Sequence, residues 1–334
     1  MLRVPYEKLQ AEFRRVLEKN GFGHDKAELC AKVFAQNSLD GVASHGLNRF
    51  PEFIAQVSEG LVDATASPTL EERFGAWERW EGNLGPGICN ATFCMDRAIA
   101  LAREYGLGAV ALKNTNHWMR AGTYGWQAAE AGCIGICWTN TPPLMPPWGA
   151  KETKVGNNPL VIAVPRANGQ HVVVDAAMSL FAIGKMHSYR LSGYLLPLDG
   201  GYDEQGNLTR DPGSILASKR PLPIGYWKGS GLALLLDLTA VALSGGLSTR
   251  QLGMKDTHYK ASQVFLAFDM SKLPDAAQFQ EELELIVADF QAAAPVADGQ
   301  AVRYPGQGSW QTRQENLAQG VPVEPAIWQK VLAM

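Results

Sequence analysis

The chain has 334 residues, of which 46% are hydrophobic and 19% are charged, and its formal net charge is −3. This composition excludes a disordered chain, and the length predicts about two domains. The 30 basic and 33 acidic residues form no basic stretch, so no nucleic-acid partner is expected. Five cysteines without a C-x-x-C pair favour reduced thiols in a cytoplasmic protein over a disulfide framework or a zinc site.

The N-terminal part is predicted to be helical. Apolar residues recur at helical spacing over residues 9–17 and 50–57, and glycines at positions 21 and 60 follow them as stops. Asp25 and Glu28 predict the capping box of a helix that ends near Phe34. A polar, glycine-bracketed segment, residues 40–49, separates the second and third helices.

From about residue 75 the pattern changes to short β-like runs. They lie at 109–112, 134–138, 160–164, 171–174 and 264–268, with helical patterns at 91–105 and 124–131. We expect an α+β (mixed) fold. Its parts are a helical N-terminal region (1–75), a sheet-containing region with a helical insertion (76–308), and C-terminal helices (309–334) that pack back on the N-terminal region.

The most apolar stretch, residues 232–243, is too short to span a bilayer and predicts a buried helix. The first residues also lack the apolar core of a signal peptide. Neither feature favours a membrane protein.

A dinucleotide-binding Rossmann motif is not supported. The formal match G-x-G-x-x-A begins at Gly106 and ends at Ala111. In a Rossmann unit these glycines follow a strand and open a helix, whereas here a helix precedes and a strand follows. Gly106 therefore predicts the C-cap of the preceding helix. The chain also lacks a P-loop sequence.

Two of the six histidines lie in polar segments that suit a site. His45 stands between Ser44 and Gly46, and His117 follows a predicted strand. With Arg49 they offer an imidazole that exchanges protons near neutral pH and a guanidinium that binds a carboxylate. This combination fits a 2-oxo or 2-hydroxy acid, although each residue alone also fits an ordinary structural role.

Three further segments are candidates for binding a phosphate or a nucleotide. Lys228 lies in the glycine-rich run 225–231, just before the apolar helix, where free backbone N–H groups would face an anion. The run Gly306-Gln307-Gly308 is similar, and Asp175 ends a predicted strand. A solvated loop and an ordinary turn remain equally good interpretations.

Several motifs in the same order carry a resemblance to a known family. They are Ser44-His45-Gly46 with Arg49, Asn116-His117-Trp118, residues 146–151 and residues 225–231. Over essentially its whole length the chain resembles the type-2 malate/L-lactate dehydrogenase family. The resemblance implies a non-Rossmann NAD(P)-binding fold with a mixed sheet and helical domains, and a homodimer with its active site near the subunit interface.

The resemblance also implies roles for individual residues. His45 or His117 would be the acid/base, with Ser44 and Arg49 holding a small 2-oxo or 2-hydroxy acid. The cofactor, NAD(H) or NADP(H), would bind to the following residues: Val174, Asp175, Ala176, Ala177, Trp227, Lys228, Gly306, Gln307, Gly308 and Thr139. Many relatives carry an acidic residue just after the position of Gly306, and its absence here leaves the choice between NAD and NADP open.

Two other functions remain open at this stage. A keto-acid lyase would use Lys228 or Lys151 as a Schiff-base nucleophile. A binding module would hold a nucleotide or a sugar acid without turning it over. The resemblance favours a dehydrogenase or reductase that acts on a CH–OH group, with no metal ion.

Overall fold

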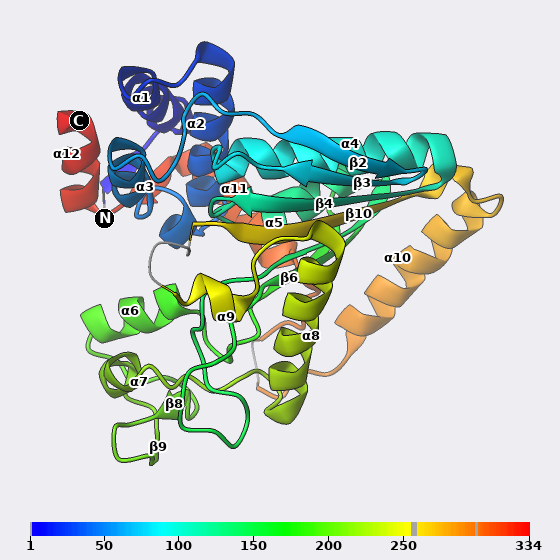
Figure 1. The fold of residues 1–334 in the computed structure, drawn as a ribbon. Helices are drawn as coiled ribbons and strands as arrows, with labels where there is room; N and C mark the ends of the chain where they lie inside the picture. The colour runs from blue at the N-terminus through cyan, green and yellow to red at the C-terminus, as the bar shows by residue number, and fades with distance from the viewer. Residues whose placement is uncertain (1, 255–258, 298–299) are drawn as a thin grey trace.

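The computed structural model describes residues 2–254, 259–297 and 300–334. Its centre is a seven-stranded sheet in the order β2-β3-β4-β10-β5-β6-β7 (Figure 1). The strands are β2 (Thr69–Phe74), β3 (Trp77–Glu81), β4 (Leu107–Thr115), β5 (Cys133–Thr139), β6 (Leu160–Val164), β7 (Val172–Ala176) and β10 (Ala261–Asp269). β3 and β4 pair in parallel, and the other neighbours pair in antiparallel. The expected mixed, non-Rossmann sheet is therefore confirmed, since a Rossmann sheet is mostly parallel.

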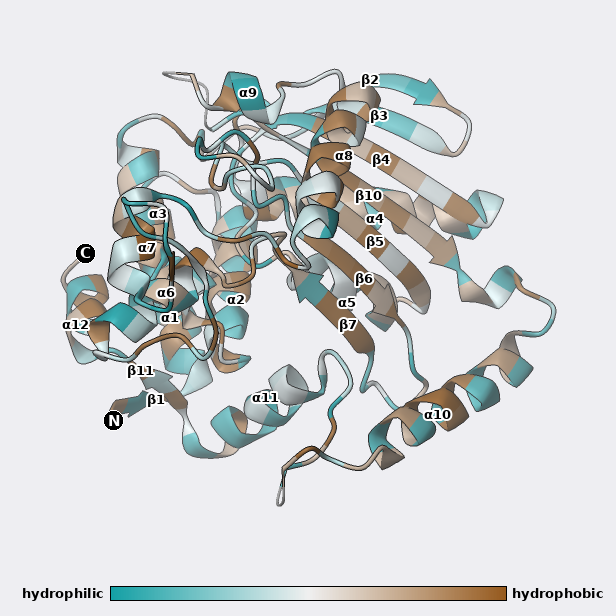
Figure 2. Ribbon diagram, turned by 90° about the horizontal axis from the view of Figure 1, so that it is seen from below, coloured by the Kyte–Doolittle hydropathy of each residue, from teal (hydrophilic) through white to brown (hydrophobic). Residues whose placement is uncertain are grey.

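Helices cover both faces of this sheet (Figure 2). α4 (Gly87–Tyr105) and α5 (Gly122–Glu130) lie on one face, and α8 (Trp227–Ser244) lies on the other. Neighbouring residues of one strand serve opposite faces: Val110 packs with the α4 side and Ala111 with the α8 side. Burial on both faces explains why the central strands β4, β5 and β10 are largely apolar runs in the sequence, unlike the polar edge strand β2.

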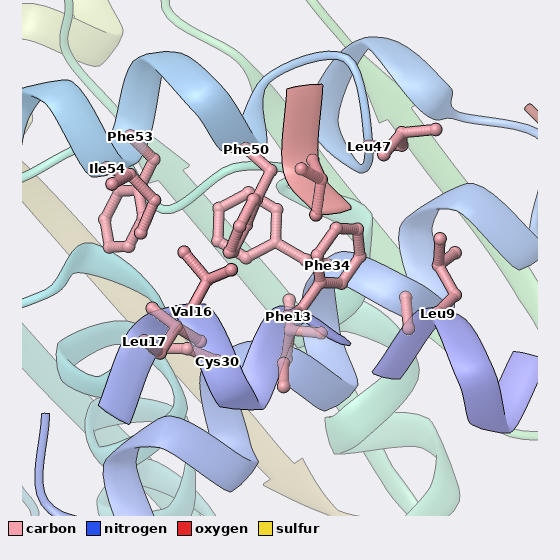
Figure 3. Packing of buried hydrophobic residues seen from close by; sticks show 14 of the residues in the cluster. Leu9, Phe13, Val16, Leu17, Cys30, Phe34, Leu47, Phe50, Phe53 and Ile54 are labelled. Carbon is pink, nitrogen blue, oxygen red and sulfur yellow. The ribbon is translucent and has the colours of Figure 1, made fainter. Parts of the chain in front are cut away.

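The N-terminal helices form a second core. α1 (Tyr6–Lys19), α2 (His24–Leu39) and α3 (Phe50–Ser58) bury a group of aromatic and aliphatic side chains (Figure 3). The ring centroids of Phe13 and Phe50 are 4.3 Å apart, and Phe34 meets Phe50 edge-on at 5.1 Å. Dense aromatic packing of this kind stabilises the helical layer that carries the segment with His45.

The end of the chain returns to this N-terminal core. β1 (Leu2–Val4) pairs with β11 (Val321–Val323), and α12 (Pro325–Ala333) contributes Trp328 and Val331 to the core. α11 (Gln307–Gln319) leads back toward it from the edge of the sheet (Figure 2). The two chain termini therefore lie close together (Figure 1).

A small lobe follows the sheet strand β7. It consists of α6 (Ile183–Leu191), α7 (Pro212–Ser218) and the hairpin β8 (Gly201–Tyr202) and β9 (Leu208–Thr209). Its own core contains Phe181, Met186, Leu196 and Ile215. The remaining elements are η1 (Ala43–His45), α9 (Thr249–Leu252), η2 (Met270–Lys272) and α10 (Ala276–Ala292), which stands away from the body of the molecule (Figure 1).

Helix boundaries confirm one prediction and correct two. Gly106 is the C-cap of α4 with φ 88°, as predicted. The capping box at Asp25 is wrong, because α2 starts at His24 with Gly23 as its N-cap and runs to Leu39. The glycine-rich run 225–231 is not a loop before the helix, because α8 already begins at Trp227.

The prediction that the apolar helix is buried holds for one face of α8 only. Its outer leucines, Leu232, Leu234, Leu235 and Leu238, are 39–57% exposed. Within the part of the chain that the structure describes, no helix combines the length and the apolar character needed to cross a membrane.

Candidate active site

Polar side chains of α2 position the segment that carries His45. Asn37 Nδ2 donates to the backbone oxygen of His45 at 3.0 Å. Ser38 Oγ accepts from the backbone N–H of Leu47 at 2.9 Å. Both side chains are buried in the last turn of α2. Buried polar groups require such partners, so these hydrogen bonds fix the backbone of the segment.

His117 lies in the loop between β4 and α5, in a constrained backbone. Met119 has φ 65° although it is not glycine, and its N–H donates to His117 Nδ1 at 3.0 Å. The first residue of α4, Gly87, packs below the loop, where a Cβ atom would lie 2.3 Å from the backbone oxygens of Asn116 and His117. A strained, tightly packed loop of this kind is typical of a functional site.

The fold brings the two predicted histidines together. The rings of His45 and His117 are stacked, with centroids 5.7 Å apart and an angle of 21° between their planes. Ser44 Oγ lies 3.1 Å from His45 Nδ1. Arg49, which precedes α3, is half-buried and forms an ion pair with Glu52 at 2.7 Å. The four residues expected to be catalytic therefore lie on two adjacent segments that are distant in the sequence.

The two imidazoles differ in protonation. His117 is an exposed residue, but the protein atoms around its ring lower its pKa from 6.5 to about 3. Desolvation is the largest cause, and the charges of His45 and Arg49 add to it. Because its Nδ1 accepts a hydrogen bond, the neutral ring carries its proton on Nε2. Burial also lowers the pKa of His45, while the carboxylate of Asp175 opposes that shift. His45 is therefore the ring that titrates closer to neutral pH.

Asp175 lies nearer to this site than the sequence alone indicated. It stands at the end of β7, and its Oδ2 accepts from the backbone N–H of Gly122 at 2.8 Å, at the start of α5. A carboxylate at a helix N-terminus is stabilised by the helix dipole. Its influence on the pKa of His45 makes Asp175 an electrostatic neighbour of that ring as well as part of the predicted cofactor segment.

A buried ion network behind the site was missed at the sequence level. The carboxylate of Asp40 is 1% exposed and accepts from Arg120 and from Arg313, the latter at 2.7 and 2.9 Å. Arg120 Nε also lies 3.9 Å from Asp175 Oδ2. Asp40 and Arg120 sit in the two polar segments that drew attention to the histidines, but nothing local in the sequence pairs them with Arg313.

An apolar pocket lies on the other face of β7. It has a volume of about 360 Å³ and is lined by Leu160, Val174, Ala176, Met178, Ile224, Gly225, Lys228, Gly229 and Leu232. Val174, Ala176 and Lys228 were all predicted to bind the cofactor, and Trp227, 65% exposed, opens α8 beside them. Lys228 is the one charged side chain among these described lining residues. Ligand pockets commonly have such apolar walls with few polar groups.

The remaining predicted cofactor residues are distributed unevenly. Ala177 directly follows β7, and the segment 306–308 lies along the same strand, where Val173 N donates to Pro305 O at 3.0 Å. Gly306 has φ 95° and packs against the backbone of Val173. Thr139 is placed differently, because it is buried and its hydroxyl donates to the carbonyl oxygens of Asn140 and Ser262.

Other chemistries find less support. Lys228 and Lys151, the two lysines considered for a Schiff base, are both exposed to solvent, whereas a nucleophilic lysine is activated by desolvation or by a nearby cation. Among the described residues there is no group of three or more histidine, cysteine, aspartate or glutamate side chains that could hold a metal ion.

Comparison with known proteins identifies the family. The malate/L-lactate dehydrogenase family profile matches residues 4–332. The chain belongs to the malate/L-lactate dehydrogenase family. A family member from Pasteurella multocida, named 2,3-diketo-L-gulonate reductase, is 45% identical over 335 residues and is covered completely, as is this chain.

Solved structures show the same fold. Malate dehydrogenase from Entamoeba histolytica has a TM-score of 0.95 at 23% identity, covering 99% of this chain and 96% of its own. Sulfolactate dehydrogenase from Methanocaldococcus jannaschii has a TM-score of 0.89 at 27% identity, with coverage of 99% and 95%. The family resemblance seen in the motifs is confirmed. Within the family the same motifs are most like those of the 2,3-diketo-L-gulonate reductases, and the 45% identity confirms that resemblance as well. As a dehydrogenase family member the chain is an oxidoreductase that uses a nicotinamide cofactor.

The unequal environments of the two histidines predict unequal titration. We expect the His117 ring to stay neutral between about pH 5 and 8, because its folded pKa lies near 3. The His45 ring should titrate with a midpoint below 6.5. NMR of the labelled imidazoles, assigned with His45→Asn and His117→Asn variants, measures both midpoints. A His117 midpoint near 6.5 would contradict this assignment.

Proposed function

We propose that this protein reduces the C2 carbonyl of 2,3-diketo-L-gulonate, or of a closely related 2-oxo acid, with a nicotinamide cofactor. The observation that carries the proposal is the stacked pair His45 and His117 with Arg49 and Asp175 as charged neighbours. The name of the 45% identical relative supports the choice of substrate within the family. The same site would also serve malate- or lactate-type 2-hydroxy acids.

His45 is the proposed acid/base. In the direction of reduction it gives its proton to the substrate oxygen, and in the reverse direction it takes that proton back. The carboxylate of Asp175 favours the charged imidazolium, which opposes the effect of burial. Ser44, at hydrogen-bond distance from Nδ1, fixes the orientation of the ring.

His117 has a different proposed role. A ring with a pKa of about 3 is a poor proton donor at neutral pH, but its Nε2–H is a fixed hydrogen-bond donor. We assign it to hold the substrate oxygen. Arg49 binds the carboxylate of the acid through its guanidinium, exchanging part of its contact with Glu52 for the ligand.

The apolar pocket fits the cofactor that the family uses. When bound, the nicotinamide supplies the hydride. Val174 and Ala176 would contact it from the sheet, and Lys228 would face a phosphate group at the start of α8. We propose NAD(H) as the cofactor, and because the described lining contains no carboxylate to repel a 2′-phosphate, NADP(H) would be accepted as well.

We further propose a cytoplasmic homodimer. The outer leucines of α8 and the exposed Leu285, Ile286 and Phe290 of α10 leave apolar surface that a second copy would cover. All five cysteines are unpaired by disulfides, which is consistent with a reducing compartment.

Removing the proposed acid tests the reaction directly. His45→Ala should lower kcat for reduction by about 10²–10⁴-fold while NADH still binds, because the proton donor is lost but the pocket is intact. The measurement is NADH absorbance with 2,3-diketogulonate and a panel of other 2-oxo acids. The matched control is His24→Ala, an exposed histidine at the start of α2, which should behave as wild type.

Near-normal turnover by His45→Ala would remove His45 from the role. A wild-type protein that binds these acids but consumes no NADH or NADPH would instead favour a binding module. A lysine trapped by borohydride in the presence of substrate would favour a lyase.

Filling the pocket tests the cofactor site. Ala176→Phe places a ring in the 360 Å³ pocket and should weaken NADH binding at least about 10-fold, by displacing apolar contact. Fluorescence titration with NADH measures the Kd. Ala167→Phe, the same change in an exposed turn at the opposite end of β7, should leave it unchanged. Equal affinities for all three proteins would place the cofactor elsewhere.

A charge on the outer face of α8 tests the dimer. Leu238→Asp should convert a dimer into monomers in sedimentation analysis, because a buried unpaired carboxylate is costly. Leu208→Asp, at an equally exposed leucine of the small lobe, should keep the dimer mass. A wild-type monomer at micromolar concentration would contradict the proposal.

A further inference from the structure

Arg120 joins the buried ion network to the candidate active site. Its side chain is 7% exposed and uses all of its nitrogen groups on protein partners. Nη1 donates to Asp40 Oδ2, Nη2 donates to Ser309 Oγ at 3.2 Å, and Nε lies 3.9 Å from Asp175 Oδ2. A planar guanidinium can direct its three nitrogen groups to three partners at once, whereas a lysine ammonium cannot.

Those three partners belong to three parts of the site. Asp40 ends α2 and begins the segment that carries His45. Asp175 ends β7, and Ser309 lies in the first turn of α11, just after the predicted cofactor segment 306–308. Arg120 itself follows His117 by three residues, in the same loop. From the His117 loop, the side chain of Arg120 therefore reaches the end of α2, the end of β7 and the first turn of α11.

We infer that Arg120 is a positioning residue of the site: it holds the Asp175 carboxylate toward His45 and partly neutralises it, while Asp40 and Ser309 fix the guanidinium. The inference rests on the proposed role of His45. The Asp175 carboxylate also accepts a hydrogen bond from the Gly122 N–H. Loss of Arg120 therefore removes the positive charge beside Asp175 but leaves its side chain in place.

His45 reports on this arrangement. The groups that face it are Asp175 from β7, Arg120 from the loop before α5, Arg49 from the start of α3, and the stacked His117. Asp175 raises its pKa, whereas Arg49 and Arg120 lower it. Removing the charge of Arg120 therefore favours the imidazolium in two ways, directly and by leaving Asp175 unbalanced.

A variant of Arg313 distinguishes the effect of Arg120 on Asp175 from the effect of losing one partner of Asp40. Arg313 forms an ion pair with the same Asp40 carboxylate through two hydrogen bonds, and its guanidinium packs over the ring of Trp126 at 5.2 Å. Arg120→Met and Arg313→Met each leave Asp40 with one guanidinium. They differ in the contact with Asp175.

The experiment measures kcat for reduction against pH in wild type, Arg120→Met, Arg120→Lys and Arg313→Met. Reduction needs protonated His45, so the rate falls as pH rises through its pKa. The midpoint of that fall should rise by about half to one pH unit in Arg120→Met. It should stay near the wild-type value in Arg120→Lys, which keeps the charge, and in Arg313→Met. The KM for NADH should not change, because Arg120 does not line the pocket.

A wild-type midpoint in Arg120→Met would overturn the inference, and so would an equal shift in Arg313→Met, which would trace the effect to Asp40. An equal shift in Arg120→Lys would also overturn it. If Arg120→Met does not fold, Arg120→Gln carries the same expectation. NMR titration of the His45 ring without substrate should show the same order of midpoints among the four proteins, so it decides the role of Arg120 even if no 2-oxo acid is reduced and the proposed function fails.

Discussion

The buried carboxylate of Asp40 links the segments that carry the candidate active site. Asp40 is nearly inaccessible to solvent, and a charge in that position is tolerated only with good partners. Arg120 and Arg313 supply them from the loop after β4 and from α11. The end of α2, the His117 loop and α11 therefore adopt one mutual arrangement. The stacked histidines, the end of β7 and the segment 306–308 follow from it.

The environment gives the two chemically identical rings of His45 and His117 different pKa shifts. A backbone N–H fixes the tautomer of His117, and desolvation keeps that ring neutral. His45 experiences a balance of burial and the opposing charges of Asp175, Arg49 and Arg120. Pairs of titratable groups whose surroundings separate their pKa values are a common basis for assigning acid, base and hydrogen-bond donor in enzymes.

Local patterns in the sequence predict much of this architecture. Helical periodicity finds α1 and α3, and continuous apolar runs find strands β4, β5, β6, β7 and β10, because both signals depend on near neighbours. The order helix–glycine–strand around Gly106 correctly excludes a Rossmann unit. His45, His117 and Arg49 stand out since each lies in a polar turn beside an element end, and the fold brings the segments together.

Some local features escape the sequence analysis, such as the hairpin of β2 and β3, but the missed features of the site depend on contacts over long distances along the chain. The partners of Asp40 lie 80 and 273 positions away, so no spacing rule connects them. The position of Asp175 beside His45 depends on where α5 starts, and the exposed face of α8 depends on what packs against it. Thr139 ends a strand, as Asp175 nearly does, yet its hydroxyl is used inside the protein.

Isotope transfer tests the central claim most directly. The reaction should be run with 2,3-diketogulonate and a nicotinamide cofactor that carries deuterium on the transferred position of carbon 4. If the protein is the proposed reductase, the product carries one deuterium atom on carbon 2, and His45→Ala forms at least about 100-fold less of this labelled product in the same time. Product without deuterium, or no product at all with any 2-oxo acid, would contradict the account.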